Sequence, residues 1–174
     1  MNEKRVLGLK DTVTIGILAA MCAIATSIQI PFGAGAMVHL GTAFLFTAAI
    51  NFGGVYAGLS GAIGSAFFDL LMGFSPYTPW SFVIKGFAGL LAGCAAQGLW
   101  PREYDPSAPW LLRSLIGCLL AAAWTLGGYI IAWWQVTGSL SVAFANSPGS
   151  LLTSCVGLIV ALFLAPRLRK ALRR

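Results

Sequence analysis

Residues 38–93 read VHLGTAFLFTAAINFGGVYAGLSGAIGSAFFDLLMGFSPYTPWSFVIKGFAGLLAG, and this stretch decides the fold. Nearly all of it is apolar or small, and a membrane-spanning helix needs about 20 mainly apolar residues. Two breaks interrupt it: the glycine pair at 53–54 and the segment GFSPYTP at 73–79. Glycine and proline mark turns between helices. The stretch therefore predicts three consecutive membrane helices, over residues 38–52, 55–72 and 79–99.

The rest of the chain has the same character. Of its 174 residues, 58% are hydrophobic and 9% are charged, whereas a soluble domain carries about 25% charged residues. Because apolar runs continue to the end of the chain, the first run is expected to be a retained helix and not a cleaved signal peptide. The sequence predicts an all-α integral membrane bundle of six transmembrane helices that forms one domain, residues 1–174. The three further helices are expected over residues 12–30, 110–134 and 148–165, with a Gly-rich loop at 31–37 and a polar loop at 135–146.

The basic residues predict how the bundle is oriented. With six helices, all 11 Lys and Arg residues except Lys85 fall on the side that holds both termini. Positive charge concentrates on the cytoplasmic side of a membrane, so both termini are predicted to be cytoplasmic in a multi-pass protein of the bacterial inner membrane. Five or seven helices would separate the two basic ends. The net charge of +6 could suggest that the protein binds nucleic acid. The position of the basic residues at the membrane surface argues against this and favours contact with anionic lipid.

Enzyme motifs are missing from the sequence. It has no P-loop, no HExxH zinc motif and no nucleophile elbow. The four cysteines lie inside apolar runs and show neither metal-type pairing nor a disulfide framework; they are Cys22, Cys94, Cys118 and Cys155. The sequence therefore predicts no catalytic residue, no metal and no cofactor, and a small membrane enzyme is the weakest of the function classes considered.

Three ionisable residues remain within the apolar part of the chain: His39, Asp69 and Lys85. A charge at the centre of a spanning helix costs about 2.5–3.5 kcal/mol, so each needs a reason. The helical rise places Asp69 about 6 Å and Lys85 about 9 Å inside the outer ends of their helices, and His39 is expected to open the second helix on the same side. Asp69 and Lys85 share helix faces with small residues, which allow close helix contact. Both are therefore expected to point into the bundle.

Two interpretations of these charges stay open. In one, Asp69 and Lys85 form a structural ion pair between two helices. In the other, both line a solute pocket that opens outward, and the two arrangements can coexist. Tyr77 and Trp80 at the outer rim suit a pocket for a planar heterocycle, although aromatic side chains also gather at membrane interfaces as anchors.

The same stretch resembles the substrate-binding S components of energy-coupling factor (ECF) vitamin transporters. The motifs that carry the resemblance are the glycine-rich third helix, FDLLMG at 68–73 and YTPWSFVIKG at 77–86, together with the six-helix length. Ala19 and Ala23 match the AxxxA pattern that such proteins place against the transmembrane coupling subunit, and the pair also suits contact within the bundle. The last third of the chain is similar only in hydropathy.

The resemblance implies a function. Such a protein captures a vitamin or vitamin precursor from outside, docks on a coupling subunit with two cytoplasmic ATPase subunits, and topples in the membrane to release its cargo. The motif set is most similar to carriers of pyridine or pyrimidine vitamin pieces, which favours a pyridoxine-like compound or hydroxymethylpyrimidine over pantothenate or riboflavin.

The predicted substrate-binding residues follow from the three ionisable residues, the aromatic residues at the outer rim and the resemblance together. The resemblance also implies that the loop 31–37 is a gate that closes over the solute. At one of the predicted binding residues, Thr42, relatives often carry an acidic residue or Asn, so the sequence departs from their pattern. The alternative is a structural or assembly protein with a buried Asp–Lys pair and no solute. The full set is His39, Thr42, Asp69, Tyr77, Trp80 and Lys85.

Overall fold

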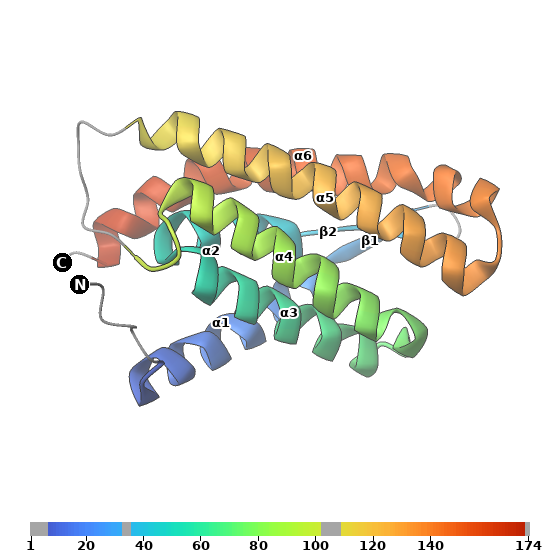
Figure 1. Ribbon diagram of the computed structural model, residues 1–174, viewed down its shortest axis with the longest axis horizontal. Coiled ribbons are helices and arrows are strands. Elements are labelled where there is room, and N and C mark those ends of the chain that lie inside the picture. Colours follow the sequence, from blue (N-terminus) through green and yellow to red (C-terminus); the bar gives the residue numbers. More distant parts are fainter. Residues whose placement is uncertain (1–6, 33–35, 102–108, 173–174) are drawn as a thin grey trace.

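The computed structural model describes residues 7–32, 36–101 and 109–172, most of them in long helices (Figure 1). Five helical segments are long and apolar enough to cross a membrane, and α2 is shorter. The predicted all-α membrane bundle is thus confirmed, apart from one small hairpin. The elements are α1 (Leu9–Ser27), β1 (Gln29–Phe32), β2 (Ala36–His39), α2 (Gly41–Phe52), α3 (Gly54–Leu71), the 3-10 helix η1 (Ser75–Tyr77), α4 (Thr78–Ala96), α5 (Trp110–Thr137) and α6 (Leu140–Leu172).

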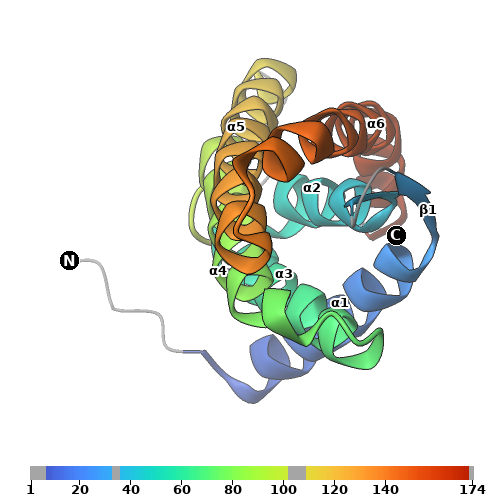
Figure 2. The same ribbon diagram turned by 90° about the vertical axis from the view of Figure 1, so that its right-hand side faces the viewer.

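Helix α2 is the core of the bundle. Figure 2 shows it enclosed by the other helices. Its residues Leu45, Phe46 and Ile50 are each at most 2% exposed, and a helix that is apolar on all sides is one that is buried on all sides. Helices α3 and α4 pack so closely against each other that a Cβ at Gly89 would lie 2.4 Å from the carbonyl oxygen of Ala57.

The helix faces predicted to meet lipid are the exposed ones. On α3, the side chains of Leu59, Ile63, Phe67 and Leu70 are exposed, whereas Asp69 on the other face is 6% exposed. Lys85 on α4 is 4% exposed. The prediction that both charged side chains point into the bundle is therefore confirmed.

Basic residues gather at one end of the bundle. Helix α1 begins and α6 ends at the left of Figure 1, where α5 also begins. Among the described residues, every Lys and Arg except Lys85 lies on these helix ends: Lys10, Arg113, Arg167, Arg169 and Lys170. The other basic residues used in the orientation argument lie outside the described residues: Lys4, Arg5, Arg102, Arg173 and Arg174.

A two-stranded hairpin replaces the expected end of the first helix and most of the Gly-rich loop. Strands β1 and β2 pair antiparallel, from Gln29 opposite His39 to Phe32 opposite Ala36. The predictions that the helix reaches residue 30 and that His39 opens the second helix were therefore wrong. Non-helical backbone at membrane depth must have its polar groups paired, and the pairing of β1 with β2 supplies partners for the backbone groups between the two strands. Residues 33–35 of the predicted gate lie outside the described residues.

The predicted polar loop at 135–146 is also wrong, because helix occupies all of these residues except 138 and 139. Gly138, with a φ of 70°, makes the turn between α5 and α6, and α6 begins at Leu140. Pro148, expected to start the sixth helix, lies inside α6. A proline within a helix removes one backbone hydrogen bond, and packing in a membrane bundle tolerates such a break.

Candidate functional site

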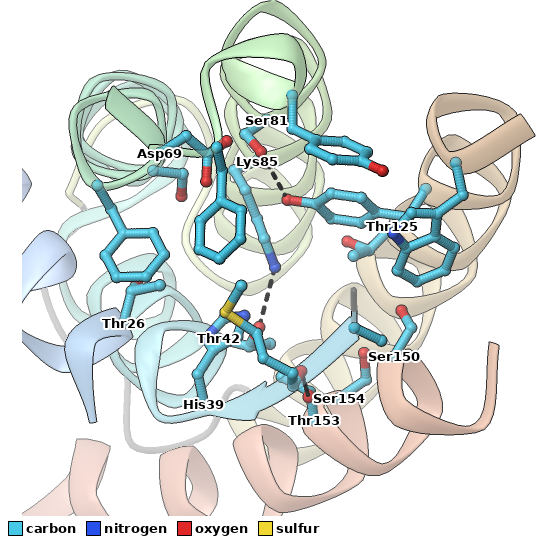
Figure 3. A pocket seen from close by; sticks show the side chains of 18 residues that line it. Thr26, His39, Thr42, Asp69, Ser81, Lys85, Thr125, Ser150, Thr153 and Ser154 are labelled. Carbon is cyan, nitrogen blue, oxygen red and sulfur yellow. Dashed lines mark hydrogen bonds between the residues drawn. The ribbon is translucent and has the colours of Figure 1, made fainter. Parts of the chain in front are cut away.

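A cavity opens among all six helices and the hairpin. It encloses about 690 Å³, including the solvent at its mouth, and Figure 3 shows the side chains that line it. Five of the six predicted substrate-binding residues are among them. The lining consists of Thr26, Ala36, Met37, His39, Thr42, Ser65, Phe68, Asp69, Phe74, Tyr77, Ser81, Lys85, Thr125, Tyr129, Trp133, Ser150, Thr153 and Ser154.

The side chain of Lys85 crosses the middle of the cavity (Figure 3). Its Nζ donates a hydrogen bond to Thr42 Oγ1 at 3.0 Å and lies 5.5 Å from the centre of the Tyr129 ring. An ammonium over an aromatic face is attracted by the negative potential of the ring. Thr42 and Tyr129 thus hold the ammonium in the cavity and use part of its hydrogen-bonding capacity.

Asp69 does not form an ion pair with Lys85. The structure of the described residues contains no contact of 4.0 Å or less between the carboxylate and the ammonium, and Asp69 Oδ2 is buried without a hydrogen-bond partner. The interpretation of the two residues as a structural ion pair is therefore wrong. An unsatisfied buried acceptor costs about 1–3 kcal/mol, and more when it is charged. An unsatisfied buried group in a native structure calls for an explanation, and at the wall of a cavity a bound molecule can supply the donor.

Aromatic rings form the apolar walls between these polar groups. Phe68 and Phe74 stack with their centres 6.4 Å apart, and Tyr129 and Trp133 lie 5.5 Å apart on α5. The hydroxyls of Ser81 and Tyr129 are 3.0 Å apart and hydrogen-bonded, which fixes the Tyr129 ring. Flat apolar walls with a few fixed polar groups are typical of sites for small planar molecules.

His39 is held in one tautomer at the foot of the cavity. Its Nδ1 accepts a hydrogen bond from the Gly41 backbone N–H at 3.1 Å, so the proton of the neutral ring is on Nε2. The half-buried neutral ring therefore offers one N–H donor, Nε2–H.

Hydroxyl groups from α5 and α6 line the wall that the sequence analysis missed. Ser150, Thr153 and Ser154 recur at the three- and four-residue spacing of one helix face, and Thr125 faces them from α5. The single hydroxyl proton of Thr153 is shared between the backbone oxygens of Gly149 in α6 at 2.9 Å and of Met37 in the hairpin at 3.2 Å, which brings α6 against the hairpin. The spacing was visible in the sequence, but small hydroxyl side chains are common in membrane helices and did not distinguish this face.

Two predicted groups of residues lie elsewhere. Trp80 is half-buried and does not line the cavity, whereas its neighbour Tyr77 does. Ala19 and Ala23 are 4% and 8% exposed; they pack inside the bundle, where a Cβ at Gly64 of α3 would lie 2.5 Å from the Ala19 carbonyl oxygen. Both Ala residues are therefore already covered by this chain.

No metal centre is evident, since the described part of the chain contains no group of three or more His, Cys, Asp or Glu side chains that could hold an ion. The side chains that line the cavity offer hydrogen bonds, charge and aromatic contact, all of which suit an organic solute.

Comparison with known proteins places the chain in a family. Among solved structures, one described as "Structure and mechanism of the S component of a bacterial ECF transporter" has a TM-score of 0.69 at 19% sequence identity and covers 95% of this chain and 98% of that chain. This likeness shows the fold. No curated protein sequence matches significantly. The sequence model of the family described as "ECF-type riboflavin transporter, S component" matches residues 6–170. The match extends over nearly the whole chain, and the protein therefore belongs to the family of ECF-type riboflavin transporter S components.

Proposed function

We propose that this protein is the solute-capture subunit of an ECF-type uptake transporter for a small vitamin or vitamin precursor. The observation that carries the proposal is the cavity in which Asp69 and Lys85 are buried without pairing with each other. Buried charges within membrane helices are rare and mark sites of function. The alternative, a structural or assembly protein, was argued from a buried Asp–Lys ion pair, and these two side chains do not form one.

Two lines of reasoning bear on the solute. The sequence motifs favour a pyridoxine-like compound or hydroxymethylpyrimidine, while the description of the family includes riboflavin. All three contain a planar ring that the walls at Phe68, Tyr129 and Trp133 accommodate. Pantothenate has no such ring and suits these walls least.

The proposed membrane placement has six crossings with both termini in the cytoplasm of a bacterium. An even number of crossings agrees with the position of the start of α1 and the end of α6 at one end of the bundle (Figure 1). The described basic residues at that end agree with a cytoplasmic location. The cavity then opens on the outer side, where a capture subunit meets its solute.

Docking on the coupling subunit, which carries two cytoplasmic ATPase subunits, is proposed for the outward face of α1. Because Ala19 and Ala23 are buried, the small pair that remains available is Gly16 and Ala20, both exposed. A Cβ at Gly16 would have no atom within 4 Å. Small residues on an exposed face let another helix approach closely.

Solute capture is tested with the purified protein in lipid nanodiscs. Native mass spectrometry and titration with pyridoxine, hydroxymethylpyrimidine, riboflavin and pantothenate are expected to reveal one tight ligand. Asp69→Ala and Lys85→Ala should each abolish its binding, whereas Lys10→Ala, which removes an exposed lysine, should not. Full affinity in both cavity variants would contradict the site. Failure of every solute to bind would favour the structural alternative.

Docking is tested by uptake in cells that also express a coupling module. Ala20→Trp places a bulky side chain on the exposed face of α1 and is expected to block uptake without reducing solute binding. Normal uptake by Ala20→Trp would show that this face does not dock.

A further inference from the structure

The cavity holds a hydrogen-bond donor and a hydrogen-bond acceptor that are both incompletely used. An ammonium has three N–H donors, and within the described structure Lys85 Nζ has one hydrogen-bond acceptor, Thr42 Oγ1. Asp69 Oδ2 is an acceptor with no donor. Both side chains are at least 94% buried and line the cavity.

These two groups are separate, and Lys85 is held in place. They are more than 4.0 Å apart, since no ion pair joins them, and Thr42 together with the Tyr129 ring holds Lys85 in place. Figure 3 places Asp69 on one side of the Lys85 ammonium and Ser150 and Ser154 on the opposite side. A single molecule beside Lys85 can therefore meet a carboxylate at one edge and hydroxyls at the other.

The complementary molecule can be deduced from these partners. Its group toward Asp69 must donate a hydrogen bond, and its group toward Lys85 must accept one, as an anionic or carbonyl oxygen does. His39 Nε2–H adds a second donor for the accepting edge. Serine hydroxyls both donate and accept, so they suit a hydroxyl-bearing substituent. The aromatic walls require the ring that carries these groups to be flat.

We propose that the cavity selects a planar heteroaromatic solute that carries both an N–H donor, directed at Asp69, and an oxygen acceptor, directed at Lys85. This inference rests on the proposed solute capture. It separates such rings from solutes that offer a carboxylate alone, because a carboxylate facing Asp69 would bring two like charges together in a buried site.

The test compares parent rings with analogues that lack only the N–H. Pyridoxine is paired with N-methylpyridoxinium, which keeps the positive ring, and riboflavin is paired with 3-methylriboflavin. The affinity of the wild-type protein for whichever parent binds is expected to exceed that for its methylated analogue by about 10- to 100-fold, the loss of one hydrogen bond to a charged group. In Asp69→Asn this ratio should collapse to a few-fold, while in the matched exposed variant Lys10→Ala it should persist.

The outcomes separate the two proposals. A methylated analogue that binds as tightly as its parent, or a ratio unchanged in Asp69→Asn, overturns the donor–acceptor inference and leaves capture intact. Tight binding of pantothenate in place of either ring has the same meaning. If pyridoxine, riboflavin, hydroxymethylpyrimidine and pantothenate all fail to bind, the capture function itself is refuted, and this inference with it.

Discussion

The substitution Gly41→Ala should disturb the cavity through one identifiable contact. Gly41 is the first residue of α2, directly after the hairpin, where the end of α1 passes. A Cβ at this position would lie 2.0 Å from Thr26 Oγ1 and 2.9 Å from His39 Nδ1. An ordinary contact begins at 3.4 Å, so Thr26 or Gly41 must move by about 1.4 Å, the difference between the two distances.

Thr26 cannot yield without cost. It is 5% exposed, and its Oγ1 donates to the Cys22 carbonyl oxygen at 2.7 Å. Overpacking of this kind typically costs about 1–3 kcal/mol. Since Thr26 and His39 both line the cavity, Gly41→Ala is expected to lower the unfolding free energy by that amount and to weaken solute binding as well.

A second substitution identifies the cause. Thr26→Ala removes Oγ1 and leaves the contacts at 2.9 and 3.0 Å, so it should reduce the cost of Gly41→Ala by about 1 kcal/mol in a double-mutant cycle. The matched control is Gly127→Ala on α5, where a Cβ meets nothing within 4 Å; alanine should be neutral or stabilising there because it favours helix over glycine. Unfolding is followed by circular dichroism in mixed micelles. A Gly41→Ala protein as stable as Gly127→Ala, or additive costs in the cycle, would refute the reasoning.

Three further predictions concern single side chains. His39 is the one histidine of the chain, and its Nδ1 accepts a hydrogen bond from the Gly41 backbone N–H. Nitrogen NMR of the untagged protein at neutral pH should therefore show a neutral ring protonated on Nε2, and a ring protonated on Nδ1 would contradict this hydrogen bond. Trp133→Leu should weaken solute binding several-fold through lost ring contact, whereas Trp80→Leu should leave it unchanged; equal effects in titrations would show that the wall is assigned wrongly. Tyr56→Phe removes the hydrogen bond from Tyr56 to the Asp11 carboxylate and should lower the unfolding free energy by about 1.5–3 kcal/mol, so an unchanged denaturation midpoint would mean that this bond between α1 and α3 contributes nothing.

Hydropathy and helical spacing were sufficient to predict the parts of this protein that depend on one helix at a time. The breaks at Gly53 and Gly73 and the inward direction of Asp69 and Lys85 follow from runs of apolar residues and from the side-chain repeat of a helix. Asp69 and Lys85 line the cavity for the same reason: a charge on the small-residue face of a membrane helix points to its neighbours. This argument does not cover the other three predicted residues that line the cavity, which lie on β2, α2 and η1.

What the sequence did not predict depends on contacts between segments far apart in the chain. The hairpin forms because residues 29–32 and 36–39 satisfy each other's backbone groups, and a Gly-rich stretch alone does not show this. The sequence pattern offered Asp69 as a partner of Lys85, and only the packing of α2 against α4 shows that the hydrogen bond goes to Thr42. Ala19 and Ala23 likewise have the same spacing whether they meet α3 or another subunit.

The short length of α2 has a consequence for how the chain enters the bilayer. Its 12 residues rise about 18 Å, well short of the roughly 30 Å hydrocarbon layer. The four residues of β2 add about 13 Å, so in the proposed placement strand and helix together make one composite crossing. The backbone groups at the strand end of this crossing would be unsatisfied if it lay in lipid alone during biosynthesis. It must be held by segments made after it, and the solute cavity is therefore completed only when α6, the last helix, closes against the hairpin.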